Sequence, residues 1–254
     1  MRVAVAGGTG VVGRHVVAVL QERGHEVRVL SRSAGVDVRT GRGLPAALDG
    51  VGAVVDVANV ATTRRAAATG FFTAVTEHLL DAGRRAGVGH HVVLSIVGID
   101  DVDTGYYAGK RRQEALALAG GVPASVLRAT QFHEFAAQML DRLRLGPVAF
   151  VPRMRTQPVA AREVGEALAD LAVGPAVGRA PDLGGPEVHT VADLVGRVLR
   201  ARGERVRLVP FPVPGRAGRA MAGSGLLPGP DARRGRTTFE EWLTAPDGLR
   251  LYDR

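Results

Sequence analysis

The stretch "VAVAGGTGVVGRHV" near the start of the chain restricts its fold more than any other part of the sequence. Gly7, Gly10 and Gly13 stand in G-x-x-G-x-x-G spacing, directly after a short apolar run and directly before a helical pattern. Glycines at the first two positions allow a tight turn and close approach of the backbone to a pyrophosphate, and the third allows close packing of helix on strand. A glycine-rich turn without a ligand is the alternative, but the position between strand and helix favours a dinucleotide-binding turn.

Short apolar runs alternate with helical patterns over the first 130 residues. Runs rich in Val and Leu predict buried parallel strands at residues 2–7, 26–31, 53–58, 90–96 and 124–129, with a weaker strand at 36–39. The segments between them predict helices at residues 11–23, 66–87 and 105–119. This β-α-β-α order predicts an α/β protein with a Rossmann-type, doubly wound parallel sheet.

The pattern changes after Thr130. Helices are expected at residues 132–145, 162–172 and 190–202, short strands near Val148 and Pro158, a Gly/Pro-rich segment at 210–230 and a capped helix at 237–243. We interpret residues 1–254 as a single Rossmann-type domain. Residues 1–130 are expected to bind the dinucleotide, and residues 131–254 to form a small C-terminal substrate-binding lobe over the carboxyl end of the sheet.

Charge and composition exclude several classes of function. The formal net charge is +8, but the basic residues are spread along the whole chain without interleaved aromatics, so no nucleic-acid partner is predicted. No apolar run approaches the ~18 residues that span a bilayer, and no signal-peptide pattern is visible, so we expect a cytoplasmic protein with no membrane partner. The chain contains no cysteine, and no metal site is predicted. A monomer or homodimer is expected.

The end of the second predicted strand selects the cofactor. An acidic residue there would bind the ribose hydroxyls of NAD, whereas Ser31 and Arg32 suit a 2′-phosphate, so NADP (NADPH) is predicted. Arg32 alone has a rival interpretation as an ordinary surface arginine, and the missing carboxylate is the stronger argument. The predicted cofactor contacts are Gly7, Thr9, Gly10, Val11, Val12, Gly13, Ser31, Arg32, Ala58, Asn59 and Lys110.

Three side chains form the predicted catalytic set. Lys110 is the only lysine in the chain, and Tyr106 precedes it by one helical turn in Y-x-x-x-K spacing. A nearby ammonium lowers the pKa of a phenol, so that the phenol can protonate a carbonyl oxygen while Ser95, at the end of a central strand, donates a hydrogen bond to the same oxygen. Tyr107 is an alternative proton donor, and an ion pair between Lys110 and Glu114 is the alternative interpretation of the lysine.

The segments "GGTGVVGR", "VVLSIVGID", "GYYAGKRRQE" and "LRATQFHEF" resemble the atypical, NmrA-like group of short-chain dehydrogenase/reductases. The resemblance implies an NADPH-dependent reductase of a carbonyl or quinone on a small apolar molecule, such as one used in biosynthesis. Alternatives are a redox-sensing regulator that binds the nucleotide without turnover, or a non-redox isomerase or cyclase. It also implies a substrate side lined by Tyr107, Gln131, Phe132 and His133, where His133 is either an acid/base or a packed histidine. Where many relatives have an adenine-binding Asp, the chain has residues 40–43, "TGRG".

Overall fold

The computed structural model describes residues 1–246 and 248–249. The chain divides into two compact units: residues 1–96, 104–128 and 162–181 form the first, and residues 97–103, 129–161 and 182–254 form the second. The first unit contains a parallel sheet in the order β2-β1-β3-β4-β5, with β9 beside β5. Its strands are β1 (Arg2–Ala6), β2 (Glu26–Leu30), β3 (Ala53–Asp56), β4 (His90–Ile96), β5 (Ala124–Ala129) and β9 (Gly178–Arg179).

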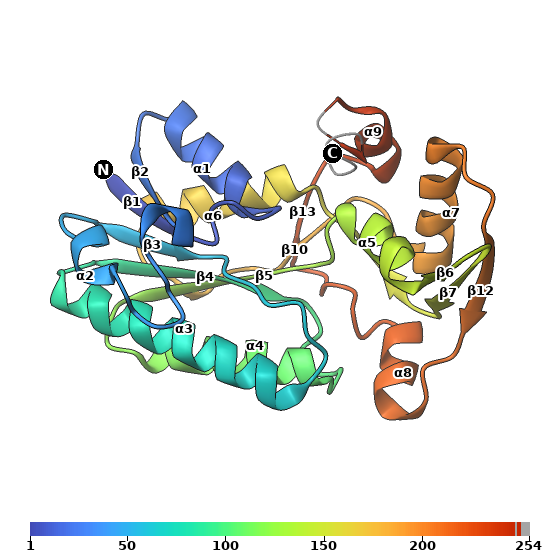
Figure 1. Ribbon diagram of the computed structural model, residues 1–254, viewed down its shortest axis with the longest axis horizontal. Helices are drawn as coiled ribbons and strands as arrows, with labels where there is room; N and C mark the ends of the chain where they lie inside the picture. The colour runs from blue at the N-terminus through green and yellow to red at the C-terminus, as the bar shows by residue number, and fades with distance from the viewer. Residues whose placement is uncertain (247, 250–254) are drawn as a thin grey trace. The chain divides into compact units, whose positions relative to one another are not determined.

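Helices cover both faces of this sheet, as the alternating sequence pattern predicts (Figure 1). The helices α1 (Gly13–Glu22) and α6 (Ala161–Val173) lie on one face, and α3 (Arg65–Arg85) and α4 (Gly105–Ala119) lie on the other. The short helix α2 (Leu44–Ala47) and the 3-10 turn η1 (Arg32–Ala34) complete this unit. The doubly wound, Rossmann-type parallel sheet predicted from the sequence is confirmed.

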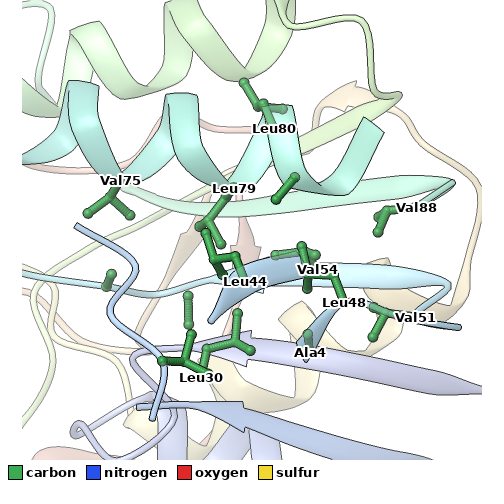
Figure 2. Close-up of a cluster of buried hydrophobic side chains, with 14 of the residues drawn as sticks. Ala4, Leu30, Leu44, Leu48, Val51, Val54, Val75, Leu79, Leu80 and Val88 are labelled. Carbon is green, nitrogen blue, oxygen red and sulfur yellow. The ribbon is translucent and has the colours of Figure 1, made fainter. Parts of the chain in front are cut away.

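A cluster of buried aliphatic side chains fixes α3 against the sheet (Figure 2). Val75 and Leu79 of α3 and Leu44 of α2 are all fully buried, and they share this cluster with Val54 of β3 and Ala4 of β1. Each fully buried Leu or Val contributes about 1.5–3 kcal/mol relative to an exposed position. This packing places α3, and with it the neighbouring α4, over β3 and β4.

The second unit consists of short strands and four helices in the part of the chain that the structure describes. The helices α5 (Glu134–Leu143) and α7 (Val191–Arg202) lie side by side next to a small mixed sheet of β6, β7 and β12 (Figure 1). Its remaining helices are α8 (Gly215–Ala222) and α9 (Phe239–Thr244). The strands are β6 (Arg144–Leu145), β7 (Val148–Pro152), β8 (Arg155–Thr156), β10 (Leu183–Gly184), β11 (His189–Thr190), β12 (Arg207–Phe211) and β13 (Arg233–Arg234).

Two local predictions differ from the structure. Residues 36–39 form no strand and make only an isolated bridge between Asp37 and Arg42, since the chain turns back on itself there. The Gly/Pro-rich segment 210–230 contains the helix α8, whose first residue, Gly215, follows Pro214 at the N-cap. The capped helix expected at 237–243 is present as α9, where Thr238 and Glu241 form a complete capping box.

The core in Figure 2 gives a stability prediction. We expect Leu79→Ala to lower the free energy of unfolding by about 3 kcal/mol, because Leu79 is fully buried and its removal leaves a cavity between α3 and the sheet. Chemical denaturation followed by circular dichroism measures this change. The matched control is Leu118→Ala on α4, where the leucine is 40% exposed and a change below about 1 kcal/mol is expected. Equal losses in the two variants would contradict this assignment of the core.

Candidate functional site

The glycine turn connects the carboxyl end of β1 to the first turn of α1. Gly7 has a φ of +80°, and a Cβ there would lie 2.8 Å from the Val57 carbonyl oxygen, so glycine is required. A Cβ on Gly13 would lie 2.0 Å from the Gly7 carbonyl oxygen, which explains the third glycine. Helix α1 has no side-chain cap and no acidic residue in its first turn. Its amino end is therefore suited to an anion such as a pyrophosphate.

Polar groups that suit a phosphate follow the neighbouring strand β2. The Ser31 hydroxyl accepts a hydrogen bond from the Ala34 N–H at 3.3 Å and lies 2.9 Å from the Ser33 hydroxyl, so it caps the turn η1. Arg32 is exposed in this turn. Arg14, in the first turn of α1, has a buried Nε with no hydrogen-bond partner among the residues that the structure describes. A buried guanidinium N–H without an acceptor fits an anionic group of a bound nucleotide.

Tyr106 and Asn59 meet at the same edge of the sheet. The Tyr106 hydroxyl donates a hydrogen bond of 2.7 Å to Asn59 Oδ1, and Asn59 stands in the loop that follows β3. Thr104 caps α4 by accepting a hydrogen bond from the Tyr107 N–H, which fixes the start of the helix that carries both tyrosines. The Tyr106 ring packs edge-on against Phe72 of α3, with the ring centroids 5.7 Å apart. The phenol is thus held beside a loop that was predicted to contact the cofactor.

Lys110 lies one turn further along α4 and is only 5% exposed. Its Nζ donates hydrogen bonds to the Leu94 carbonyl oxygen at 2.5 Å and to Gln113 Oε1, and it lies 4.7 Å from the centroid of the Phe72 ring. Burial lowers the pKa of Lys110 to about 8, although the Asp56 and Glu114 carboxylates act in the opposite direction. Lys110 and Tyr106 therefore both contact the Phe72 ring.

Ser95 lies inside the packing between β4 and α4. Its side chain is 1% exposed and neighbours the Glu114 carboxylate. Burial alone would raise the pKa of Glu114, but the hydrogen bonds from Arg128 and Arg179 outweigh burial and hold the pKa below its usual range. Arg128 donates two hydrogen bonds of 2.8 Å to Glu114, and Arg179 donates one of 2.5 Å. A hydroxyl buried to this extent offers almost no surface to a substrate.

The predicted substrate-side residues lie in different environments. Tyr107 is half-buried beside Tyr106 in the first unit. In the second unit, Gln131 Oε1 accepts a hydrogen bond from the Thr156 hydroxyl, and Phe132 is half-buried and bridges to Val159. His133 is 1% exposed and packs against Phe239 and Trp242, with ring centroids 5.5 and 5.7 Å away.

The environment of His133 favours a packed histidine over an acid/base. Burial lowers the pKa of His133 to about 4, although its hydrogen bond with the Thr237 carbonyl oxygen opposes this effect. The ring is therefore neutral at physiological pH.

The sequence analysis did not predict a pair of buried polar side chains, Asp56 on β3 and Gln113 on α4. Both side chains are fully buried. Gln113 Nε2 donates a hydrogen bond of 2.8 Å to Asp56 Oδ2, and the Ala58 N–H donates one of 3.0 Å to Asp56 Oδ1. A carboxylate at the end of the apolar run "AVVD" was the available signal, since a charge in such a strand needs partners when buried.

One protein-family model matches part of the chain. Residues 3–98 match the NAD dependent epimerase/dehydratase family. The match contains β1 to β4 and the glycine turn, and it covers less than half of the 254 residues. No curated protein sequence matches the chain. The more specific NmrA-like resemblance stays a prediction.

Solved structures of low sequence identity share the fold. The dTDP-glucose 4,6-dehydratase DesIV from Streptomyces venezuelae, with NAD bound, is 21% identical and has a TM-score of 0.71 over 100% of this chain and 97% of that chain. A short-chain dehydrogenase/reductase superfamily protein from Agrobacterium tumefaciens, with NAD bound, is 21% identical with a TM-score of 0.70 over 96% and 95%. The UDP-glucose 4-epimerase from Thermus thermophilus, also with NAD, is 22% identical with a TM-score of 0.67 over 95% and 91%.

Among the described residues, no helix combines the length and the apolar character that crossing a bilayer requires.

The two glycines of the turn are expected to respond differently to a methyl group. Gly13→Ala should lower the free energy of unfolding by about 2–3 kcal/mol, because its Cβ would overlap the Gly7 carbonyl oxygen. Gly10→Ala should lower it by about 1 kcal/mol or less, because a Cβ there would meet, among the described residues, the Gly7 carbonyl oxygen alone, at 3.3 Å. Urea denaturation of both variants measures the difference. Equal stabilities would show that the turn is not packed as described.

Proposed function

We propose that the chain is an NADP(H)-dependent oxidoreductase that reduces a carbonyl or quinone group on a small molecule, with Tyr106 as the proton donor. The observation that carries this proposal is the placement of the Tyr106 phenol beside Asn59, one helical turn from the buried ammonium of Lys110. The family match over residues 3–98 and the shared fold support nicotinamide chemistry at this edge of the sheet. A membership of the whole chain in that family is part of the proposal.

The chemistry assigns one step to each side chain. When bound, the nicotinamide supplies the hydride that reaches the carbonyl carbon. The Tyr106 hydroxyl transfers its proton to the carbonyl oxygen, and the resulting phenolate is stabilised by the Lys110 ammonium. Hydride and proton together convert the carbonyl into an alcohol, so the atoms and charges balance. Ser95 is given no step here, since its hydroxyl is buried beside Glu114.

The preference for NADP rests on the residues after β2. Ser31 and Ser33 form a hydroxyl pair there, Arg32 is exposed beside them, and no carboxylate follows the strand. Arg14 adds a buried Nε that has no acceptor among the described residues. A guanidinium and two hydroxyls match the hydrogen-bonding needs of a 2′-phosphate. The structurally similar proteins named above hold NAD, so this preference would distinguish the chain from them.

A second candidate is an epimerase or dehydratase acting on a nucleotide sugar. It is favoured by the similarity of fold over nearly the full length of proteins named as a dTDP-glucose 4,6-dehydratase and a UDP-glucose 4-epimerase. The net charge of +8 also suits an anionic nucleotide. Such a reaction returns the hydride to the substrate within each cycle. It therefore changes the sugar without net consumption of the nicotinamide.

Cofactor preference is tested by Arg32→Ala. We expect the variant to bind NADPH about 10-fold more weakly and NADH with unchanged affinity, because only NADPH carries the 2′-phosphate. Titration of the intrinsic or nicotinamide fluorescence measures both dissociation constants. Arg84→Ala, which removes an exposed arginine of α3, is the control and should leave both unchanged. Equal losses for the two nucleotides, or tighter binding of NADH by the wild type, would contradict the NADP assignment.

Turnover is tested by Tyr106→Phe, which retains the ring contact with Phe72 and removes the hydroxyl. With a panel of ketones and quinones, we expect NADPH oxidation to fall at least ~100-fold while NADPH affinity is retained. Tyr107→Phe tests the alternative proton donor, and its loss of NADPH oxidation should be much smaller than that of Tyr106→Phe. Incubation with UDP-glucose and dTDP-glucose, followed by product analysis, covers the second candidate. A loss in Tyr107→Phe alone would move the proton donor to the neighbouring tyrosine.

A further inference from the structure

A continuous chain of buried polar groups joins β3, α4 and β4 in the first unit. The Asp56 carboxylate accepts one hydrogen bond from the Ala58 N–H and one from Gln113 Nε2. Gln113 Oε1 then accepts from the Lys110 ammonium, which also donates to the Leu94 carbonyl oxygen. Asp56 and Gln113 are 0% exposed and Lys110 is 5% exposed. Of these side chains, only Lys110 has a part in the proposed reduction.

The chemistry of the two end groups fixes the orientation of the central amide. A carboxylate can only accept hydrogen bonds, so it must face the NH₂ group of Gln113. An ammonium can only donate, so it must face the carbonyl oxygen of the same amide. Gln113 therefore has one arrangement that satisfies both neighbours. Its amide dipole points its negative end at Lys110 and its positive end at Asp56.

The same chain reaches the Tyr106 phenol from its other end. Ala58, which donates to Asp56, is followed directly by Asn59, and Asn59 accepts the hydrogen bond from Tyr106. Tyr106 and Lys110 are i and i+4 on α4 and so lie on one face of the helix. The helix α4 is consequently held at two points, by the hydrogen bond of Gln113 to Asp56 at the end of β3 and by that of Tyr106 to Asn59 in the following loop.

We propose that Gln113 is a positioning residue that links the Lys110 ammonium to the Asp56 carboxylate and keeps Lys110 charged beside Tyr106. This proposal deepens the function proposed above and rests on it for the catalytic use of that charge. Arginine does not fit this arrangement, because a compact ammonium matches one amide oxygen and one carbonyl oxygen, whereas a planar guanidinium presents five N–H donors.

Charged and titratable groups act on Lys110 from several packed elements. Asp56 on β3 and Glu114 on α4 both stabilise the charged form, while burial acts against it. From β4, His91 lies close to Asp56, and burial lowers the pKa of His91 so that it stays neutral. From α3, the face of Phe72 also favours the cation.

Gln113 carries the effect of the Asp56 carboxylate to Lys110 through hydrogen bonds, since its amide is bonded to both groups. Its loss would leave the ammonium with one fewer acceptor in a buried position, which disfavours the charged form.

The single lysine makes a direct test possible. With lysine labelled at ¹³Cε and ¹⁵Nζ, Lys110 is the one labelled residue in the NMR spectrum, and the titration of its Cε and Nζ signals reports the pKa in the full-length protein without any substrate. We expect a wild-type pKa of about 8. The first informative variant is Gln113→Met, which keeps the size of the side chain but removes the acceptor. The second is a double variant, Asp56→Asn with Gln113→Glu, which exchanges the carboxylate and the amide between the two positions. Gln21→Met, at an exposed position on α1, is the matched control.

The two variants shift the titration in opposite directions. Gln113→Met should lower the pKa of Lys110 by about one pH unit or more, since a charge-assisted hydrogen bond is lost. The double variant retains every hydrogen bond of the chain but places the carboxylate next to the ammonium, so the pKa should rise above the wild-type value. A pKa lowered from 10.5 means that the ammonium is lost as pH rises through about 8. The alkaline limb of NADPH oxidation should therefore move to lower pH in the first variant and to higher pH in the second.

The outcomes separate this proposal from the proposed function. An unchanged Lys110 pKa in Gln113→Met, or an unchanged or lower one in the double variant, overturns the role of Gln113. The double variant decides the matter alone if Gln113→Met does not fold. If the pKa moves as expected but the alkaline limb does not follow it, Gln113 is a structural residue only and the proposal is overturned. If the pKa moves but no substrate is reduced by any variant or by the wild type, the proposed function fails and the link from Gln113 to Lys110 stands.

Discussion

A buried ammonium is the constraint on which the candidate site of this protein depends. Lys110 is 5% exposed, and a cation in such a place is stable only when acceptors surround it. The Leu94 carbonyl oxygen of β4 and the Gln113 amide supply these acceptors, and the face of Phe72 supplies further stabilisation from α3. The ammonium of α4 thus contacts both the strand β4 and the helix α3. These contacts fix the position of α4, and with it the position of Tyr106.

The same helix carries a second buried charge that has a purely structural environment. Glu114 is 1% exposed and is paired with Arg128 of β5 and Arg179 of β9. This cluster anchors α4 to these strands and also takes up the Ser95 side chain as a neighbour. Two consecutive residues of α4 therefore have different partners. Gln113 accepts a hydrogen bond from Lys110, whereas Glu114 forms ion pairs that fix the helix to β5 and β9.

Much of this arrangement could be predicted from the sequence because it depends on local patterns. The spacing of Gly7, Gly10 and Gly13 and the alternation of apolar runs with helical segments predict the sheet and the glycine turn, and the structure confirms both. The link between Asp56 and Gln113 joins residues 57 positions apart, so no local pattern contains it. The same reason applies to Ser95, which was predicted to donate a hydrogen bond to a substrate from the end of a strand. Its side chain is 1% exposed and lies beside Glu114, whose arginine partners stand far from Ser95 in the sequence.

The prediction of a strand at residues 36–39 was wrong for a different reason. β-branched residues favour an extended backbone only where a neighbouring strand is available for pairing. Here the isolated bridge from Asp37 to Arg42 replaces such a pairing.

The surroundings of a residue also explain why the chain has its one lysine at position 110. A sequence that uses arginine for its other cations retains lysine where the cation is buried, has two oxygen acceptors and lies beside a phenol. An arginine at this position would leave several guanidinium N–H groups without acceptors in the interior, and its pKa would not fall toward neutrality as that of a buried lysine does. The residue choice therefore follows from burial, and the effect on Tyr106 that we propose depends on where burial holds the charge.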